Sequence, residues 1–169
     1  MTFKSNMSSA AVLALSMTAS AVAAPPTAMS PEAAFVQKAG QGGMAEVELS
    51  NLAATNSSSS DVKKFATSMV AAHTDNNAKL ATIARGEGLD VPNSLDAAHA
   101  ALKAKLATSK GADFDRQYAD AMRADHTAML KLLDDNAKAI SDPKLKAFIG
   151  ETRPVVAEHL KMAKNLSGG

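Results

Sequence analysis

The sequence contains no cysteine, which excludes disulfide bonds, thiolate metal sites and a lipid-modified N-terminal cysteine. It also has no tryptophan, and aromatic residues make up only 4% of its 169 residues. The 18 basic and 17 acidic side chains leave a formal net charge of +1. A near-neutral chain with few stacking side chains lacks the features of a nucleic-acid binder, so we expect no nucleic-acid partner.

The N-terminal stretch has the three-part layout of a secretory signal peptide. Lys4 precedes an apolar run over residues 10–22, and a small-x-small cleavage site ends at Ala23. This run is too short to span a bilayer comfortably, although a retained N-terminal anchor is the alternative. We therefore expect a signal peptide over residues 1–23, a linker over 24–30, and a periplasmic or secreted mature chain without a membrane span.

The remaining chain, residues 31–166, is predicted to fold as one all-α domain. Its apolar residues recur at helical spacing in four long segments and one short one, over residues 31–55, 61–85, 95–107, 113–139 and 143–166. Short turns join the first pair and the last pair of long helices, whereas about 25 residues connect the two pairs. This connectivity predicts a ferritin-like four-helix bundle with a long crossover that carries a short extra helix.

Two features interrupt the helical pattern. Gly40, Gly42 and Gly43 lie inside the first predicted helix, where each glycine costs up to about 1 kcal/mol relative to alanine. They either break the helix or let a neighbouring backbone approach closely. Pro154 lies inside the last predicted helix and is expected to kink it.

Each long helix carries one polar residue near the middle of its apolar stripe. Each of these residues follows an apolar residue by eleven positions, which places the two about 20° apart in helical projection. The pairs are Phe35 and Glu46, Val62 and His73, Phe114 and Asp125, and Phe148 and His159. The order carboxylate, histidine, carboxylate, histidine indicates an internally duplicated helical hairpin. We expect the four polar side chains to converge near the middle of the bundle.

Burying a charge is costly unless it is paired or binds something, so two interpretations of these four residues compete. In the first, each carboxylate pairs with a histidine in the core and sets the helix register, as Glu46–His73 and Asp125–His159. In the second, the two imidazoles and two carboxylates hold one divalent transition metal. Nitrogen and oxygen donors of this kind suit iron, zinc, manganese or copper.

The chain has two further histidines: His126, which directly follows Asp125, and His99, which lies in the crossover. His126 is about 100° from Asp125, at the edge of the apolar stripe. It is either a fifth metal ligand or a partly exposed side chain. His99 lies in the crossover and is expected to be exposed to solvent.

Four short motifs carry these residues: E-V-E-L in the first long helix, M-V-x-x-H in the second, D-H in the third and P-x-x-x-x-H-L in the fourth. They lie in the stretches "FVQKAGQGGMAEVELSNLAATNSSSSDVKKFATSMVAAHTDNNAKL", "FDRQYADAMRADHTAMLKLLDDNA" and "LKAFIGETRPVVAEHLKMAKNL". In these stretches the chain resembles the exported bacterial family called domain of unknown function 4142, over about residues 31–166. The resemblance implies a ferritin-like helical fold, and the family's name implies no biochemical activity.

Ferritin-like di-iron proteins use a glutamate on each of two helices and a Glu-x-x-His motif on each of the other two. The mid-helix residues resemble part of this pattern, as lone carboxylates Glu46 and Asp125 and as histidines His73 and His159. Valines, Val70 and Val156, stand where the two bridging glutamates would be. Ferroxidase or oxygenase chemistry is therefore not expected.

Three hypotheses about function follow from the sequence. The first is a periplasmic or secreted binding module of unknown physiological role, with one metal ion held by the four mid-helix residues. The second is a metal-free structural protein, or one that contacts an envelope or protein partner, whose buried pairs set helix register. The third, a redox enzyme using bound iron or manganese, has the least support because Val70 and Val156 replace the bridging carboxylates.

Overall fold

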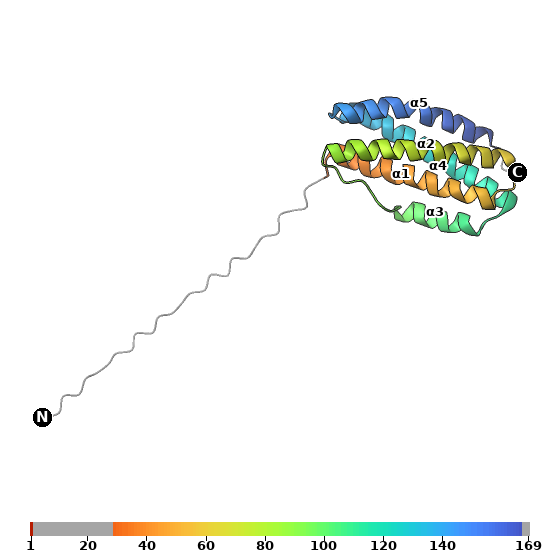
Figure 1. Cartoon of the computed structure of the whole chain (residues 1–169), viewed down its shortest axis with the longest axis horizontal. Coiled ribbons are helices and arrows are strands. Elements are labelled where there is room, and N and C mark those ends of the chain that lie inside the picture. The colour runs from red at the N-terminus through yellow and green to blue at the C-terminus, as the bar shows by residue number, and fades with distance from the viewer. Residues whose placement is uncertain (2–28, 167–169) are drawn as a thin grey trace.

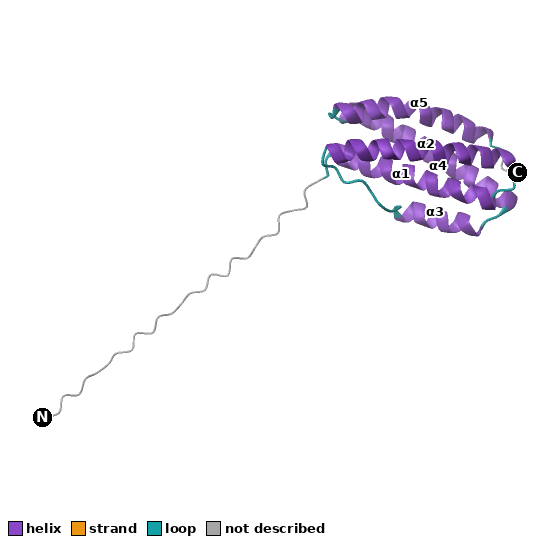
Figure 2. Ribbon diagram, in the orientation of Figure 1, coloured by secondary structure: helices purple, strands orange, loops and turns teal. Residues whose placement is uncertain are grey.

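Five helices make up the part of the chain that the computed structural model describes, residue 1 and residues 29–166. They are α1 (Pro31–Asn56), α2 (Ser60–Gly86), α3 (Ala97–Thr108), α4 (Gly111–Ala139) and α5 (Pro143–Asn165). The described residues contain no strand (Figure 2), which confirms the all-α prediction. None of these helices is both long and apolar enough to cross a membrane. The predicted cleavage site and nearly all of the predicted signal peptide and linker lie outside the described residues.

Local side-chain chemistry sets the helix ends close to their predicted positions. Ser30 accepts a hydrogen bond from the Ala33 N–H at 3.1 Å and so caps α1. Asp142 caps α5 in the same way, accepting from the Leu145 N–H at 2.7 Å. After α2, Gly88 adopts a φ of 68°, a left-handed conformation that a side chain would disfavour. These signals are local, which is why the sequence pattern finds them.

The four long helices form a bundle in which α1 packs against α2 and α4, and α5 packs against α2 and α4. Figure 1 shows successive helices running in opposite directions, with α3 returning beside α1 along the crossover. As a result, α2 and α4 run in the same direction. This is the predicted bundle with a long crossover and a short extra helix.

α1 continues as one helix through Gly40, Gly42 and Gly43. A β-carbon at position 43 would overlap the side-chain amide of Asn77 in α2, and one at position 40 would lie 2.8 Å from Cγ of Pro92. The glycines therefore admit close neighbours and do not break α1. Of the two alternatives raised by the sequence, close approach is the one observed.

Pro154 has no N–H to donate to the carbonyl of Gly150, the residue four positions earlier. The surrounding turns nevertheless belong to α5, which extends without a break from Pro143 to Asn165. Pro154 and Gly150 are both exposed, so the Gly150 carbonyl that lacks this hydrogen bond is not enclosed by the bundle core.

α3 covers one flank of the bundle beside α1 and α4. Its Leu106 is fully buried and lies in the same apolar cluster as Phe114 of α4. Asn56, at the end of α1, donates a hydrogen bond to the Leu106 carbonyl at 3.0 Å. Near its N-terminus, α4 is therefore buried by α3 as well as by the other long helices. Its buried surface there is wider than the face that points toward the bundle axis.

The loop between α1 and α2 is fastened to α4 by the buried carboxylate of Asp115. This side chain accepts hydrogen bonds from the hydroxyl of Ser57, from the N–H and hydroxyl of Ser58 at 3.2 and 2.9 Å, and from the N–H of Ser59 at 3.1 Å. The contact places a negative charge at the N-terminus of α2, where the helix dipole favours it. It joins the first helical hairpin to the second.

The core divides into two apolar clusters, one toward each end of the bundle. One contains the C-terminal part of α1 and the N-terminal parts of α2 and α4, and the other contains the opposite ends of these helices. The largest buried side chains are Leu49, Phe65, Met69, Phe114, Tyr118 and Met122 in the first cluster, and Phe35, Leu80, Leu133, Ile140, Leu145 and Phe148 in the second. A layer of polar side chains lies between them.

Candidate metal centre

One polar side chain from each long helix enters the layer between the two apolar clusters. We call these four residues the core polar cluster: Glu46 of α1, His73 of α2, His126 of α4 and His159 of α5. Their exposed fractions are 1%, 4%, 0% and 8%, respectively. Their place in the middle of each helix, with apolar residues on both sides, removes them from solvent.

The three imidazoles of the core polar cluster face one another. The ring centroids are 5.6 Å apart for His73 and His126, 5.3 Å for His73 and His159, and 5.5 Å for His126 and His159. One nitrogen from each ring lies within 4.8 Å of the other two. Metal–nitrogen bonds of about 2.0–2.1 Å in a tetrahedral site put ligand atoms about 3.4 Å apart. Small side-chain rotations would therefore bring the three nitrogens onto one ion.

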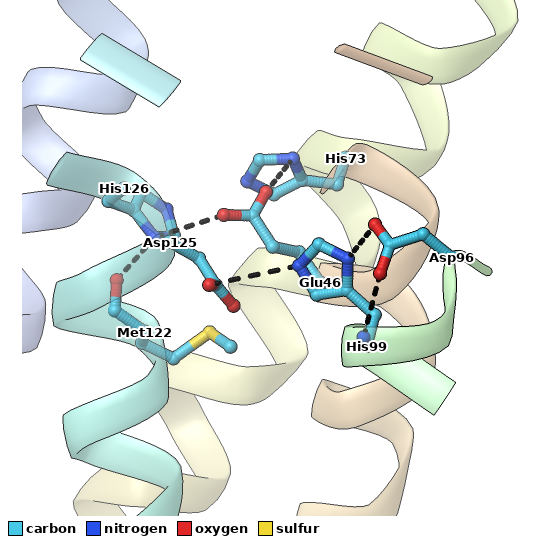
Figure 3. Close-up of polar contacts among 7 residues, drawn as sticks. All are labelled: Glu46, His73, Asp96, His99, Met122, Asp125 and His126. Atoms are coloured by element: carbon cyan, nitrogen blue, oxygen red, sulfur yellow. Dashed lines mark hydrogen bonds and ion pairs between the residues drawn. The ribbon is translucent and has the colours of Figure 1, made fainter. Parts of the chain in front are cut away.

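Glu46 supplies the negative charge of the cluster. Its Oε2 lies 2.7 Å from His73 Nδ1 and its Oε1 lies 3.1 Å from His126 Nδ1 (Figure 3), yet neither oxygen completes an aligned hydrogen bond. Burial raises the pKa of Glu46, but its interactions with the neighbouring imidazoles, His73 first among them, outweigh burial and lower that pKa overall. The carboxylate is therefore ionised at neutral pH.

The tautomer of His126 is set by its own helix. Its Nδ1 lies 2.8 Å from the carbonyl oxygen of Met122, and because a carbonyl can only accept, Nδ1 is the protonated nitrogen. The other nitrogen, Nε2, is buried and has no hydrogen-bond partner. Burial lowers the pKa of His126 and outweighs the attraction to Glu46, which raises it, and repulsion from His73 lowers it further, so the ring is neutral with its Nε2 lone pair available. An imidazole held by a carbonyl in this way is typical of metal ligands.

His159 is also neutral at physiological pH. Burial, with repulsion from His73 and His126, lowers its pKa to about 4. Its Nδ1 is buried without a hydrogen-bond partner. Neutral imidazole is the form that binds metals, so His159 and His126 both carry the protonation state that a metal site requires.

The core polar cluster leaves an unusual number of buried atoms without hydrogen bonds. Each such atom costs about 1–3 kcal/mol if nothing compensates for its lost hydration. They number six, namely both carboxylate oxygens of Glu46, both ring nitrogens of His73, Nε2 of His126 and Nδ1 of His159. Each neutral imidazole offers one lone pair and Glu46 offers two oxygens, so donors from four helices converge here and can bind a cation.

The structure brings together three of the four residues that the sequence placed at mid-bundle, Glu46, His73 and His159, and leaves out Asp125. The Asp125 side chain is 20% exposed, and its Oδ1 lies 3.8 Å from Nε2 of His99 (Figure 3). The predicted Asp125–His159 pair is therefore wrong. His126, predicted to lie at the stripe's edge, is fully buried in the position expected for Asp125.

The physical reason for this difference is the cover that α3 provides. Phe114, from which the position of Asp125 was projected, shares its apolar cluster with Leu106 of α3 as well as with residues of α1, α2 and α5, so its burial does not mark the bundle axis alone. A different spacing marks the axial face: Ala119, His126 and Leu133 are seven residues apart, about 20° per step in projection, and all are buried. That repeat is the sequence signal that would have identified His126.

The expectation that His99 is solvent-exposed is also wrong. Its side chain is 21% exposed, and its Nδ1 lies 2.6 Å from Oδ2 of Asp96, the residue that caps α3. His99 thus lies between Asp96 and Asp125, outside the core polar cluster (Figure 3). Burial, followed by repulsion from Glu46, raises the pKa of Asp125 to about 6.

Comparison with known proteins identifies a family and a fold. The family described as "Domain of unknown function (DUF4142)" matches residues 17–166. A "putative secreted protein DUF305" from Streptomyces coelicolor is 14% identical, with a TM-score of 0.69 over 81% of this chain and 91% of that one. A DUF305 fragment from Deinococcus radiodurans is 16% identical, with a TM-score of 0.71 over 82% and 96%. At these identities the likeness shows the fold alone. No curated protein matches the chain significantly.

Proposed function

The chain belongs to the DUF4142 family, a domain of unknown function, and we propose that it binds one divalent transition metal ion in its core polar cluster. The proposed ligands are one nitrogen each from His73, His126 and His159, whose ligand atoms lie within 4.8 Å of one another. The fourth is the carboxylate of Glu46, which lies against Nδ1 of His73 and of His126 and would have to rotate toward the ion. The observation that carries the proposal is the set of six buried atoms without hydrogen bonds in these four side chains. Iron, zinc, manganese and copper are the ions that such nitrogen and oxygen donors suit.

The cluster supports binding rather than di-iron chemistry. A di-iron centre needs bridging carboxylates one helical turn before each histidine, and α2 and α5 carry Val70 and Val156 there. Val156 is buried, 2% exposed, among apolar side chains. With one carboxylate in the cluster, the proposed site holds a single ion, and we propose a binding module in place of an oxygen-activating enzyme.

A metal-free structural role is the second candidate, and the contact between Glu46 and His73 favours it. The two side chains are 1% and 5% exposed and approach to 2.7 Å, as the predicted register-setting pair would. Buried pairs of this kind can specify helix register. This role leaves His126 Nε2 and His159 Nδ1 without partners, unless water enters the cluster and bonds to them.

Elemental analysis of the mature protein, purified from the periplasm without chelator or affinity metal, distinguishes the two candidates. We expect about one transition metal ion per chain, or uptake of about one on titration with zinc, manganese, iron or copper. The double variant His73→Ala, His159→Ala should lose stoichiometric binding. His99→Ala is the matched control, because it removes a histidine that lies outside the cluster, and it should retain full occupancy.

Two outcomes would overturn the metal site. Full occupancy in the double histidine variant, with its helical circular dichroism intact, would place the ion elsewhere. Wild-type protein that carries no metal and takes up none of the four ions would leave the core polar cluster as a structural element. If alanine at both positions prevents folding, the milder variant His126→Gln gives the same test, because it removes the Nε2 lone pair and keeps a similar volume.

We also propose that the chain is exported and processed near Ala23, giving a periplasmic or secreted protein. The charged, apolar and small-residue segments of residues 1–23 support export, as does the description of the Streptomyces structural neighbour as secreted. Mass spectrometry of the protein from the periplasmic fraction should find an N-terminus at or close to Ala24. A chain that keeps Met1, or stays with the cytoplasmic fraction, would contradict this proposal.

A further inference from the structure

A surface pocket of about 330 Å³ reaches the core polar cluster at Glu46. It lies between α1, α3 and α4, and its lining includes Glu46 together with Asp96, His99 and Asp125. Glu46 is 1% exposed, so the pocket extends to a buried carboxylate. The three imidazoles do not line this pocket. Glu46 is therefore the residue that the pocket and the cluster share.

Asp125 lies on the wall of this pocket between solvent and Glu46. Its side chain is 20% exposed, while its Oδ2 is buried and has no hydrogen-bond partner. Figure 3 shows His73 on one side of the Glu46 carboxylate and the Asp125–His99 pair on the other. A cation leaving Asp125 would thus meet Glu46 next and the imidazoles after it.

The charges around the pocket also favour a cation. Lys131, at the pocket wall, is paired with Asp135 at 2.6 Å, which offsets both charges. Asp96, Asp125 and Glu46 then outnumber the one remaining lysine of the lining, Lys38. Clefts with an excess of one charge raise the local concentration and arrival rate of oppositely charged ions.

A second pocket, between α2 and α5, offers a contrast. It is lined by Asp75, Asn76 and Thr152, among others, and by no member of the core polar cluster. Asp75 is an exposed acid on this face. The α2–α5 pocket therefore has carboxylates but shares no lining residue with the core polar cluster.

We propose that the pocket between α1, α3 and α4 is the entry route for a divalent cation, and that Asp125 is a transit ligand on this route. This inference rests on the proposed metal site. A hydrated ion exchanges a water for an Asp125 oxygen, then exchanges Asp125 for Glu46, and finally binds the imidazoles. Because Asp125 contacts the ion only in passage, it changes the rates of binding and release together and changes the equilibrium affinity much less.

Stopped-flow measurement of Co²⁺ uptake by the metal-free full-length mature protein tests the route. Asp125→Asn should slow association by about tenfold, within the range of electrostatic steering effects, and should slow dissociation as well, because the ion passes the same ligand on release, with occupancy retained and affinity changed much less than either rate. Ala128→Phe should slow uptake similarly by filling the pocket, and because Ala128 is an exposed position of α4, its replacement should not disturb the core. Asp75→Asn is the matched control and should bind at the wild-type rate.

Three results would overturn the entry route. Wild-type rates in both Asp125→Asn and Ala128→Phe would show that the ion enters elsewhere. A weaker affinity of Asp125→Asn with an unchanged association rate would make Asp125 an equilibrium ligand. Wild-type protein that takes up neither Co²⁺ nor iron, zinc, manganese or copper would remove the proposed metal function together with its route, whereas normal equilibrium loading with unchanged rates in both variants removes the route alone.

Discussion

Adjacent residues on a helix point about 100° apart, so the identity of the residue that faces the bundle axis decides the chemistry of the core. On α4 that residue is His126, fully buried, while Asp125 faces the pocket beside α3. The core polar cluster consequently has three imidazoles and one carboxylate. A donor set with more imidazole and less carboxylate shifts preference from manganese toward zinc and copper.

At the residue scale, the lowered pKa of His159, about 4, predicts the acid sensitivity of the metal-free protein. Between that value and the unfolded value of about 6.5, the unfolded chain binds a proton that the folded chain does not, so acidification favours unfolding. The lowered pKa of His126 acts in the same direction. Titration of His159 by itself should lower the free energy of unfolding by about 2 kcal/mol from pH 7.5 to pH 5, while the raised pKa of Asp125, about 6, offsets part of this loss in the same window.

The variant His159→Gln serves as the control for this pH effect, since glutamine has a similar size and does not titrate. Because Asp125 titrates in both proteins, the effect of His159 is the difference between them: from pH 7.5 to pH 5, wild type should lose about 2 kcal/mol of unfolding free energy relative to His159→Gln, as urea unfolding measures. The lowered pKa of Glu46 does not interfere, because its stabilisation is lost only below pH of about 4.5. Parallel pH profiles for the two proteins would contradict the assignment of this effect to His159.

At the scale of elements, the packing of α1 against its neighbours depends on glycines, which have no side chain. Gly43 lies against the amide of Asn77 in α2, and Gly40 lies against Pro92 in the crossover. These contacts bring α1 close to both neighbours while Glu46, one turn further along α1, enters the cluster. The glycines lower helix propensity but are compensated by the close packing that they permit.

The variant Gly43→Ala should therefore gain less stability than helix propensity alone would give, because its β-carbon displaces the side-chain amide of Asn77, as urea or thermal unfolding measures. Gly150→Ala in α5 is the matched control, because its β-carbon would have no neighbour within 4 Å. That change should stabilise the protein by up to about 1 kcal/mol through helix propensity. Equal gains at the two positions would show that Gly43 does not serve close packing.

At the scale of the whole molecule, the core polar cluster separates two apolar clusters and draws one residue from each long helix. An ion bound there would join all four helices, two of each hairpin. Unfolding would separate the ligands, so metal binding and global stability should be linked. Without the ion, the polar layer is the part of the core with the poorest hydrogen bonding.

Added metal should accordingly raise the melting temperature of the metal-free protein and its free energy of unfolding. The expected gain is about 2.7 kcal/mol when free metal exceeds the dissociation constant a hundredfold. Differential scanning calorimetry measures this shift, with His73→Ala, His159→Ala as the variant that should show none. A shift of the same size in that variant would indicate binding to surface carboxylates.

Much of the fold and part of the candidate site could be predicted from local patterns. Helical spacing and capping residues located the five helices, and the eleven-residue spacing placed Glu46, His73 and His159 in the core. The same spacing failed for α4, because Phe114 is also buried by α3. The burial of one reference residue, such as Phe114, shows that a helix face is covered, but not which neighbouring helix covers it.

The sequence by itself determined the all-α bundle, its connectivity and three members of the cluster, because helix periodicity and caps depend on residues a few positions apart. Only the tertiary structure decided that α1 continues through its glycines, that His126 is the fourth member of the cluster, and that Asp125 lines a pocket with His99. Each of these depends on a neighbour distant in the sequence: Asn77 and Pro92 for α1, and α3 for α4. Contacts of that kind are set by how helices pack, which spacing within one helix does not encode.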